Sequence, residues 1–383
     1  MRSTNIRYLP RLDHLRFLAA LLVLAFHLYH YFFHGWQPNP EAALIGFIVE
    51  GHSGVALFFT LSGFLFMLIA LQGPIRYRQF MFNRVLRIAP LFLVVFYLAI
   101  TLGRDEFQAT DILYVLFSNI GAPPTSDHFV TGAAWTISVE FTFYLIFPFL
   151  AAAFISQGWR YLLGVWCLLL LFKLVIHASV ADPMHVFYST LPGRLDQFLI
   201  GMAAGVLYAK YREPLARHGV FLFIGASLYC YSMLYLLARH ASTFSADRHE
   251  PLWIVWASLE AVGWALLIVG YLSLPAVRGR LAEWVGAVLM HCGKISYSFY
   301  LLHASVLFLW LEHLGVWQPT AWFAINFLAN LLVVLLLCIA IASLSYACIE
   351  RPFLKQRGRY VVEPAGAERA AVSQDVSVKP ESG

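Results

Sequence analysis

Long apolar stretches recur along the chain, and they constrain its fold more than any other feature of the sequence. A helix needs roughly 17 to 25 apolar residues to cross the hydrocarbon core of a bilayer. Only 12% of the 383 residues are charged, about half the share of roughly 25% found in soluble domains. We therefore expect an all-α integral membrane protein, a bundle of about ten transmembrane helices. The stretches lie at about 15–33, 54–72, 85–102, 137–155, 161–177, 194–209, 219–237, 252–272, 295–311 and 323–347.

The basic residues are distributed unevenly between the segments that join these stretches. If the N-terminus is inside, the inner segments hold 21 of the 26 Lys and Arg residues, the outer segments hold four, and Lys173 lies within a stretch. Because Lys and Arg in short loops are retained on the cytoplasmic side, we predict that both termini are cytoplasmic. The net charge of +5 then reflects topology and gives no reason to expect binding to nucleic acid.

The chain divides into one membrane domain, residues 1–355, and a tail, residues 356–383. The tail is rich in Ala, Glu, Pro, Ser, Val and Gly, a composition typical of a disordered segment. The longest outer loop, 103–134, is a candidate lid or acceptor surface, and a plain connector is the equal alternative. No stretch has the length and polarity of a second soluble domain.

The first apolar stretch carries ionisable side chains, which are costly inside a bilayer and therefore mark candidate sites. Arg16 and His27 are eleven residues apart, so they share one face of a helix, about 16 Å apart along its axis. Asp13 is close enough to pair with Arg16. His27 is a candidate general base, and a packed histidine bound to a neighbouring helix is the alternative. His30 and His34 continue the same face, so the three histidines could instead be metal ligands. This alternative is weaker, because His30 and His34 approach the outer interface, where histidine is tolerated.

Ionisable residues also interrupt the later stretches. Arg84 and Arg87, three residues apart, share a helix face and can present two guanidinium forks to phosphate, although positive-inside anchoring alone explains the pair more simply. Glu140, near the outer end of its stretch, is either a site residue or a helix-terminal carboxylate in water. We expect Lys173 to snorkel to the interface and Glu260 to have a buried polar partner.

Seven segments between residues 11 and 353 resemble, in order, the motifs of the acyltransferase 3 family of membrane O-acyltransferases. The first combines a basic residue, ten intervening residues and a histidine, here Arg16 and His27, and the third is an arginine-x-x-arginine motif before Pro90. An ordered set of this kind is far more specific than any single motif. The segments are Arg11–Ala20 with Phe26–His27, Gly51–Phe64, Arg84–Pro90, Trp135–Tyr144, Arg194–Gly201, Ile295–His303 and Ile349–Phe353.

The resemblance implies transfer of an acyl group, most often acetyl, from cytoplasmic acyl-coenzyme A to a hydroxyl group of an exopolysaccharide, an O-antigen or another envelope glycan. The protein would be a multi-pass protein of the cell inner membrane. Arg16, Arg84 and Arg87 would bind the phosphates of coenzyme A, and His27 and Glu140 would be catalytic, with His27 as the base. We expect acetyl-coenzyme A as the donor substrate, and neither a metal nor a permanently bound cofactor.

Several alternatives stay open from the sequence. The acceptor could be a secondary metabolite or a lipid-linked small molecule, and the acyl group could pass directly or through a transient acyl group on the protein. Ser62 could be a nucleophile, but small residues in membrane helices are more often packing contacts, so we leave it out of the catalytic set. A glycan transporter or flippase would also show buried charge, but the inverted repeats typical of transporters are not found. The sequence leaves a homo-oligomer open.

Overall fold

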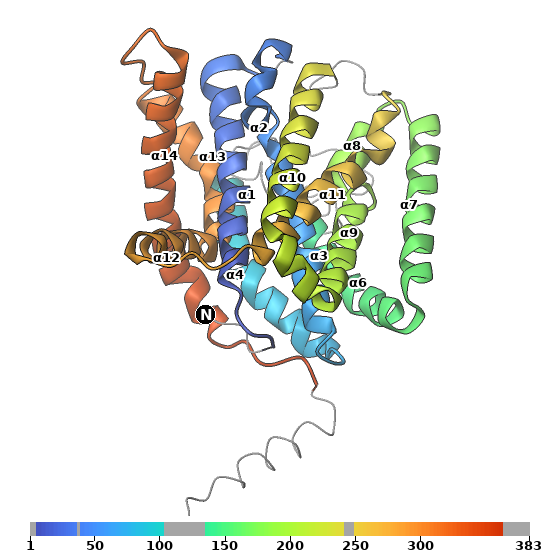
Figure 1. The fold of residues 1–383 in the computed structure, drawn as a ribbon. Coiled ribbons are helices and arrows are strands. Elements are labelled where there is room, and N and C mark those ends of the chain that lie inside the picture. Colours follow the sequence, from blue (N-terminus) through green and yellow to red (C-terminus); the bar gives the residue numbers. More distant parts are fainter. Residues whose placement is uncertain (1–4, 37–38, 103–134, 241–248, 363–383) are drawn as a thin grey trace, which may run out of the picture.

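The computed structural model describes residues 5–36, 39–102, 135–240 and 249–362 (Figure 1). Each of the ten apolar stretches corresponds to a helix in it, which confirms the all-α membrane fold. The long helices run roughly parallel as one bundle. They are α1 Pro10–Tyr29, α3 Gly54–Ala70, α4 Tyr77–Leu102, α6 Trp135–Gln157, α7 Trp159–Ser179, α9 Leu191–Lys210, α10 Arg212–His240, α11 Leu252–Ser273, α13 Ser296–His313 and α14 Phe323–Ser345.

Eight helical segments in the described part of the chain are long and apolar enough to cross a membrane, and a bent pair of helices would make nine. Helix α9 is not among them, and it carries Arg194, Asp196 and Gln197. The expected number of about ten therefore stays a prediction. So does the cytoplasmic position of the termini.

The two described ends of the chain lie together at one end of the bundle. Asn5 Oδ1 accepts hydrogen bonds from the backbone N–H groups of Tyr360 (3.0 Å) and Val361 (3.2 Å). An even number of spans would place both termini on one side of the membrane in this way. We call this end of the bundle the basic end, because the segments there carry many cations. The cations are Arg7, Arg76, Arg78, Arg351, Lys355, Arg357 and Arg359.

Shorter elements join and flank the long helices. Helix α12 (Arg280–Lys294) forms where we expected an inner loop, and it meets α13 at a bend of 72°. It lies across the bundle rather than along it (Figure 1), and its Leu281 and Trp284 are exposed, as in helices that lie in the plane of a membrane interface. The others are α2 Gly46–Val49, α8 Met184–Ser189, α15 Arg351–Leu354, π-helices His30–His34 and Tyr346–Glu350, and 3-10 helices Pro40–Ile45 and Gly51–Ser53.

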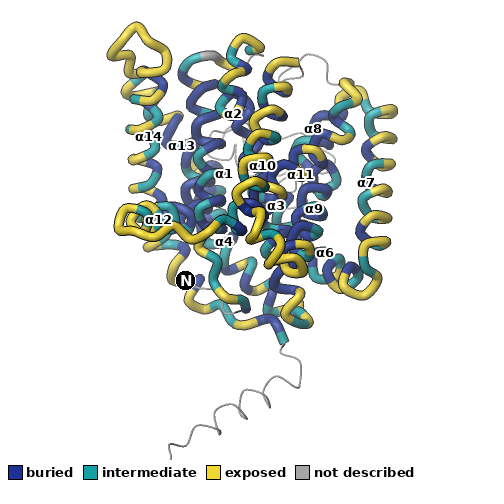
Figure 2. Tube along the Cα trace, in the orientation of Figure 1, coloured by how far each residue is buried: buried dark blue, intermediate teal, exposed yellow. Residues whose placement is uncertain are grey.

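Small residues let the central helices pack closely. A Cβ atom at Gly63 of α3 would lie 2.1 Å from the carbonyl oxygen of Phe198 in α9, and one at Gly201 of α9 would lie 2.2 Å from that of Thr60. Such contacts bring helix backbones together where lipid provides no hydrophobic driving force between helices. Helices α1 and α3 are largely buried, whereas many residues of α7 and α14 are exposed on the outside of the bundle (Figure 2). Many of these exposed residues are large and apolar.

The end of the membrane domain differs from the expected boundary at residue 356. Residues 356–362 pack on the basic end, and Tyr360 is only 2% exposed. The expected disorder of the tail is a prediction for residues 363–383, which lie outside the described residues, as does the loop 103–134.

Candidate active site

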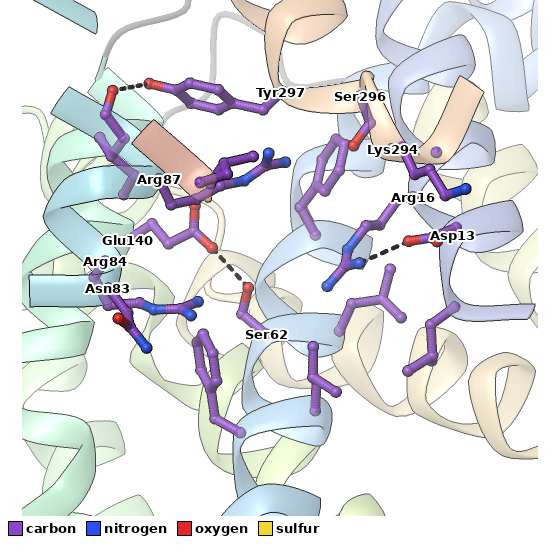
Figure 3. Close-up of a pocket in the computed structure, with 18 of the residues that line it drawn as sticks. Asp13, Arg16, Ser62, Asn83, Arg84, Arg87, Glu140, Lys294, Ser296 and Tyr297 are labelled. Atoms are coloured by element: carbon purple, nitrogen blue, oxygen red, sulfur yellow. Dashed lines mark hydrogen bonds and ion pairs between the residues drawn. The ribbon is translucent and has the colours of Figure 1, made fainter. Parts of the chain in front are cut away.

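A cavity of about 460 Å³ opens into the basic end of the bundle. Residues 5–16, α3, α4, α6, the α12–α13 bend and residues 354–360 line it. Four of the five predicted site residues, Arg16, Arg84, Arg87 and Glu140, are among the lining residues, and His27 is not. Figure 3 shows Arg84, Arg87 and Glu140 on one side of Ser62 and Arg16 with Asp13 on the other. The fold thus gathers residues from three separate motifs.

The charge of this cavity is strongly positive. Seven basic residues line it and only two carboxylates, Asp13 and Glu140. Basic clefts with partly apolar walls concentrate anionic ligands, and guanidinium groups bind phosphate through paired hydrogen bonds. The basic residues are Arg7, Arg16, Arg84, Arg87, Lys294, Lys355 and Arg357.

Arg16 is held by the carboxylate one turn before it. Its Nη1 donates to Asp13 Oδ1 at 2.8 Å, which confirms the pairing expected from their spacing. Asp13 also accepts from the hydroxyl of Tyr8. The pair fixes the guanidinium of Arg16 at the cavity wall while a third of its side chain stays exposed.

Arg84 and Arg87 share a helix face, as expected, but their surroundings differ. Arg87 Nη1 donates to Glu350 Oε2 at 2.7 Å, and the Glu350 side chain is fully buried. The guanidinium of Arg84 lies between aromatic rings, 5.0 Å from the centre of Phe66 and 5.7 Å from that of Tyr144. Its Nε is buried and has no hydrogen-bond partner among the described residues. Arg84 is therefore the cation more available to a ligand.

Glu140 is bound to a residue that our catalytic set left out. Ser62 Oγ donates to Glu140 Oε1 at 2.7 Å, and both residues line the cavity. A serine whose proton is directed at a carboxylate has the geometry of an activated nucleophile. The one feature of the sequence that pointed to a catalytic role for Ser62 was the Ser–Gly–Phe segment itself. The spacing of Ser62 along its helix does not distinguish a residue in the cavity wall from a packing contact.

His27 lies beyond the cavity, against α13. Its Nδ1 is 2.9 Å from the carbonyl oxygen of Val23 and 3.1 Å from Nε2 of His303. His303 Nδ1 in turn approaches the carbonyl oxygen of Tyr300 at 2.5 Å. Because a carbonyl can only accept, these contacts assign the proton of each neutral ring to Nδ1. In this tautomer Nε2 of His27 carries the lone pair that a general base requires.

The cavity ends close to this histidine pair. Tyr300 lines the cavity, and His303 follows it by three residues on α13, about one helical turn further from the basic end. The structure therefore does not place His27 and Glu140 in one cavity. It places Glu140 in the cavity wall and His27 beside His303, outside the cavity lining.

The alternative of a histidine metal site receives no support from its described members. Both ring nitrogens of His30 lie near carbonyl oxygens, Nδ1 at 2.6 Å from Gly35 and Nε2 at 3.0 Å from Val49. The side chain of His34 lies outside the described part. Among the described residues no group of three or more His, Cys, Asp or Glu side chains could hold a metal ion.

A second group of charged residues is buried between α7, α9 and α11. Lys173 is fully buried and donates to Asp196 Oδ2 at 2.8 Å, so its expected snorkelling was wrong, because its side chain faces α9 rather than the membrane surface. Glu260 does have the buried polar partner that we expected. Gln197 Nε2 donates to its Oε2 at 2.8 Å, and Arg194 lies 3.5 Å away.

Fold and site together define a class, that of multi-pass helical membrane proteins with a deep cationic cavity at one end. The chain belongs to the acyltransferase 3 family, whose acyltransferase domain model matches residues 9–350. This confirms the family and the enzyme class that the motifs indicated.

Two relatives are similar over most of this chain. YrhL of Bacillus subtilis, a candidate peptidoglycan O-acetyltransferase, is 26% identical over 93% of the chain. The peptidoglycan O-acetyltransferase OatA of Listeria monocytogenes is 24% identical over 91% of it. The match covers 56% of the length of each relative, so this chain spans little more than half of them. No solved structure matches the chain.

Proposed function

We propose that this chain is a membrane O-acyltransferase of the cell inner membrane that moves an acetyl group from cytoplasmic acetyl-coenzyme A to a hydroxyl group of an envelope glycan. The observation that carries the proposal is the cationic cavity at the basic end, built from the family's motif residues. The excess of Lys and Arg at that end supports its cytoplasmic position. A cytoplasmic donor would enter there.

The donor would bind with its phosphates at the mouth of the cavity. Arg84 offers a guanidinium without a carboxylate partner among the described residues. A third of the Arg16 side chain is exposed, and its guanidinium is held in place by Asp13. Arg87 keeps Glu350 on Nη1, and its other nitrogens, which have no hydrogen-bond partner in the described part of the chain, could donate to a ligand. The arm of the coenzyme would extend along the cavity toward Tyr300, which brings the thioester toward His27.

In the direct route, His27 is the general base. The proton of the acceptor hydroxyl passes to Nε2, and the hydroxyl oxygen attacks the thioester carbonyl carbon. The carbon–sulfur bond then breaks, and the leaving thiolate takes the proton from the imidazolium. The products are the O-acetyl ester and free coenzyme A. The contact with His303 holds the ring of His27 in the required orientation.

A second route is favoured by the hydrogen bond between Ser62 and Glu140. The oxygen of Ser62 would attack the thioester while Glu140 accepts its proton, and the acetyl group would rest on Ser62 before transfer to the acceptor. The carbon–sulfur bond would break as the ester on Ser62 forms, and Glu140 would return the proton to the leaving thiolate. When the acceptor hydroxyl attacks this ester, its proton would pass through Glu140 to the departing oxygen of Ser62. This route gives Glu140 the catalytic role that the family resemblance implied.

The acceptor class rests on the relatives, because OatA is named for peptidoglycan O-acetylation. An envelope glycan, whether peptidoglycan, exopolysaccharide or O-antigen, is therefore the first choice, and a secondary metabolite or lipid-linked small molecule is the alternative. The alternative from a different functional class is a glycan flippase, which would move the glycan across the membrane without catalysing a reaction.

The test uses the purified chain in liposomes with acetyl-coenzyme A labelled in its acetyl group. We expect labelled ester on peptidoglycan fragments or polysaccharide, with release of an equal amount of coenzyme A, and loss of both in His27→Ala. If the labelled acetyl group is trapped covalently on the wild-type protein but not on Ser62→Ala, the second route is favoured. Movement of glycan across the membrane with no use of the thioester would refute the proposal in favour of a flippase.

A further inference from the structure

A segment that follows the family match closes one wall of the cavity. Residues 355–362, here called the C-terminal strap, run across the basic end after the matched region stops at residue 350. Asn83 of α4 holds the strap twice: its Nδ2 donates to the carbonyl oxygen of Gly358 at 2.7 Å, and its Oδ1 accepts from the Gly358 N–H at 3.2 Å. The ring of Tyr360 packs against Phe80 with centroids 5.3 Å apart. The strap is therefore fixed to α4.

This attachment brings Arg357 into the cavity beside Arg84 and Arg87. The one hydrogen bond recorded for its side chain among the described residues runs from Nε to the carbonyl oxygen of Leu354, at 3.3 Å within the same segment. Glu350, the carboxylate that pairs with Arg87, is already bound to that guanidinium. Arg84 and Arg357 are thus two cavity-lining guanidiniums for which the described residues supply no carboxylate.

The surroundings of Arg357 disfavour its charge. Burial is the largest effect, and the positive charges of Arg87 and Arg84 add to it, so that the pKa of Arg357 falls to about 10. The group is still a cation at neutral pH. Partly desolvated cations that repel one another are stabilised when an anion binds between them. An apolar side chain would fill this position at no such cost, which indicates that the charge serves a ligand.

We propose that the C-terminal strap is part of the donor site, and that Arg357 and Arg84 together bind a phosphate group of the donor. The inference rests on the proposed function, in which the donor is an acyl-coenzyme A. That molecule carries a diphosphate and a 3′-phosphate, and either could occupy the position between the two guanidiniums. A phosphate of an anionic lipid headgroup has the same chemistry and is the competing source.

The test measures binding of acetyl-coenzyme A to the full chain in neutral detergent micelles. Arg357→Gln should raise Kd roughly ten- to a hundredfold, as expected for loss of a charge-assisted hydrogen bond. The matched control is Arg359→Gln, an exposed strap residue outside the cavity lining, which should change Kd by about twofold or less because exposed charges are screened. If Arg357→Gln is too unstable to measure, Arg357→Lys, which keeps the charge and loses the fork, should still raise Kd severalfold.

Two further comparisons separate the outcomes. The Arg84→Gln and Arg357→Gln losses should be less than additive in the double variant if both residues bind one phosphate. The same comparison is made with 3′-dephospho-acetyl-coenzyme A as the ligand. If Arg357→Gln then binds as tightly as the wild type, Arg357 contacts the 3′-phosphate; if it still binds more weakly, Arg357 contacts the diphosphate. A wild type that binds no acetyl-coenzyme A would refute the proposed donor. If the wild type binds acetyl-coenzyme A and Arg357→Gln binds it equally tightly, the strap inference alone is overturned. The same holds if phosphatidylglycerol added to the micelles competes with the donor in the wild type and the only change in Arg357→Gln is the loss of this competition.

Discussion

The different surroundings of Arg84 and Arg87 predict different consequences when each is replaced. Lysine keeps the positive charge, so Arg84→Lys and Arg87→Lys should insert normally, because the positive-inside rule counts charge and not shape. Both lose the planar fork. We expect each to weaken acetyl-coenzyme A binding by about 1 to 3 kcal/mol, which is roughly five- to a hundredfold in Kd.

Methionine separates ligand binding from stability. In Arg87→Met the carboxylate of Glu350, which has no exposed side-chain surface and lies 2.7 Å from Arg87, loses its cation. Removing one partner of such a buried pair costs about 3 to 5 kcal/mol. Among the described residues Arg84 contacts the rings of Phe66, Phe80 and Tyr144 and no carboxylate, so Arg84→Met should cost about 0.5 to 2 kcal/mol. The double variant Arg87→Met with Glu350→Leu should recover most of the first loss, because no buried charge is then left unpaired.

The assay is unfolding in mixed micelles of mild detergent and dodecyl sulfate, with the binding of acetyl-coenzyme A measured on the same preparations. The two methionine variants should differ by about 1 to 4.5 kcal/mol in the free energy of unfolding. Equal stability of Arg84→Met and Arg87→Met would show that the pair with Glu350 does not stabilise the fold. If both lysine variants bind the donor as the wild type does, the arginines serve only as membrane anchors and the donor site lies elsewhere.

The other predictions concern topology, the base and the buried ion pair. Reporter fusions after Gly73 and at the C-terminus should read cytoplasmic and one after Pro124 periplasmic, and an inverted reading at any of them would contradict the ten-helix arrangement. His27→Ala should abolish acetyl transfer while the protein reaches the membrane at the wild-type level, whereas full activity would leave His27 a packing residue. Lys173→Met should lower the free energy of unfolding in micelles by about 3 to 5 kcal/mol, and Lys173→Met combined with Asp196→Asn by clearly less; a double loss equal to the sum of the two single losses would mean that the two residues do not interact.

The sequence by itself determined the membrane class, the position of every long helix and the family. These properties follow from local quantities, namely the length and apolarity of each stretch and the order of the motifs. It also predicted four residues that line the cavity, Arg16, Arg84, Arg87 and Glu140, because each lies in a motif and on a helix end or face that can be read from spacing.

Only the tertiary structure decided which of these groups meet. Arg87 pairs with Glu350, 263 positions further along the chain, and Glu140 with Ser62, 78 positions earlier. The same holds for Lys173, whose place near the end of a helix predicted exposure although its side chain faces Asp196. Such contacts depend on how each helix is rotated about its axis and on how closely its neighbour approaches. Hydrophobic periodicity gives little information on rotation here, because membrane helices are apolar on both their lipid-facing and their buried sides.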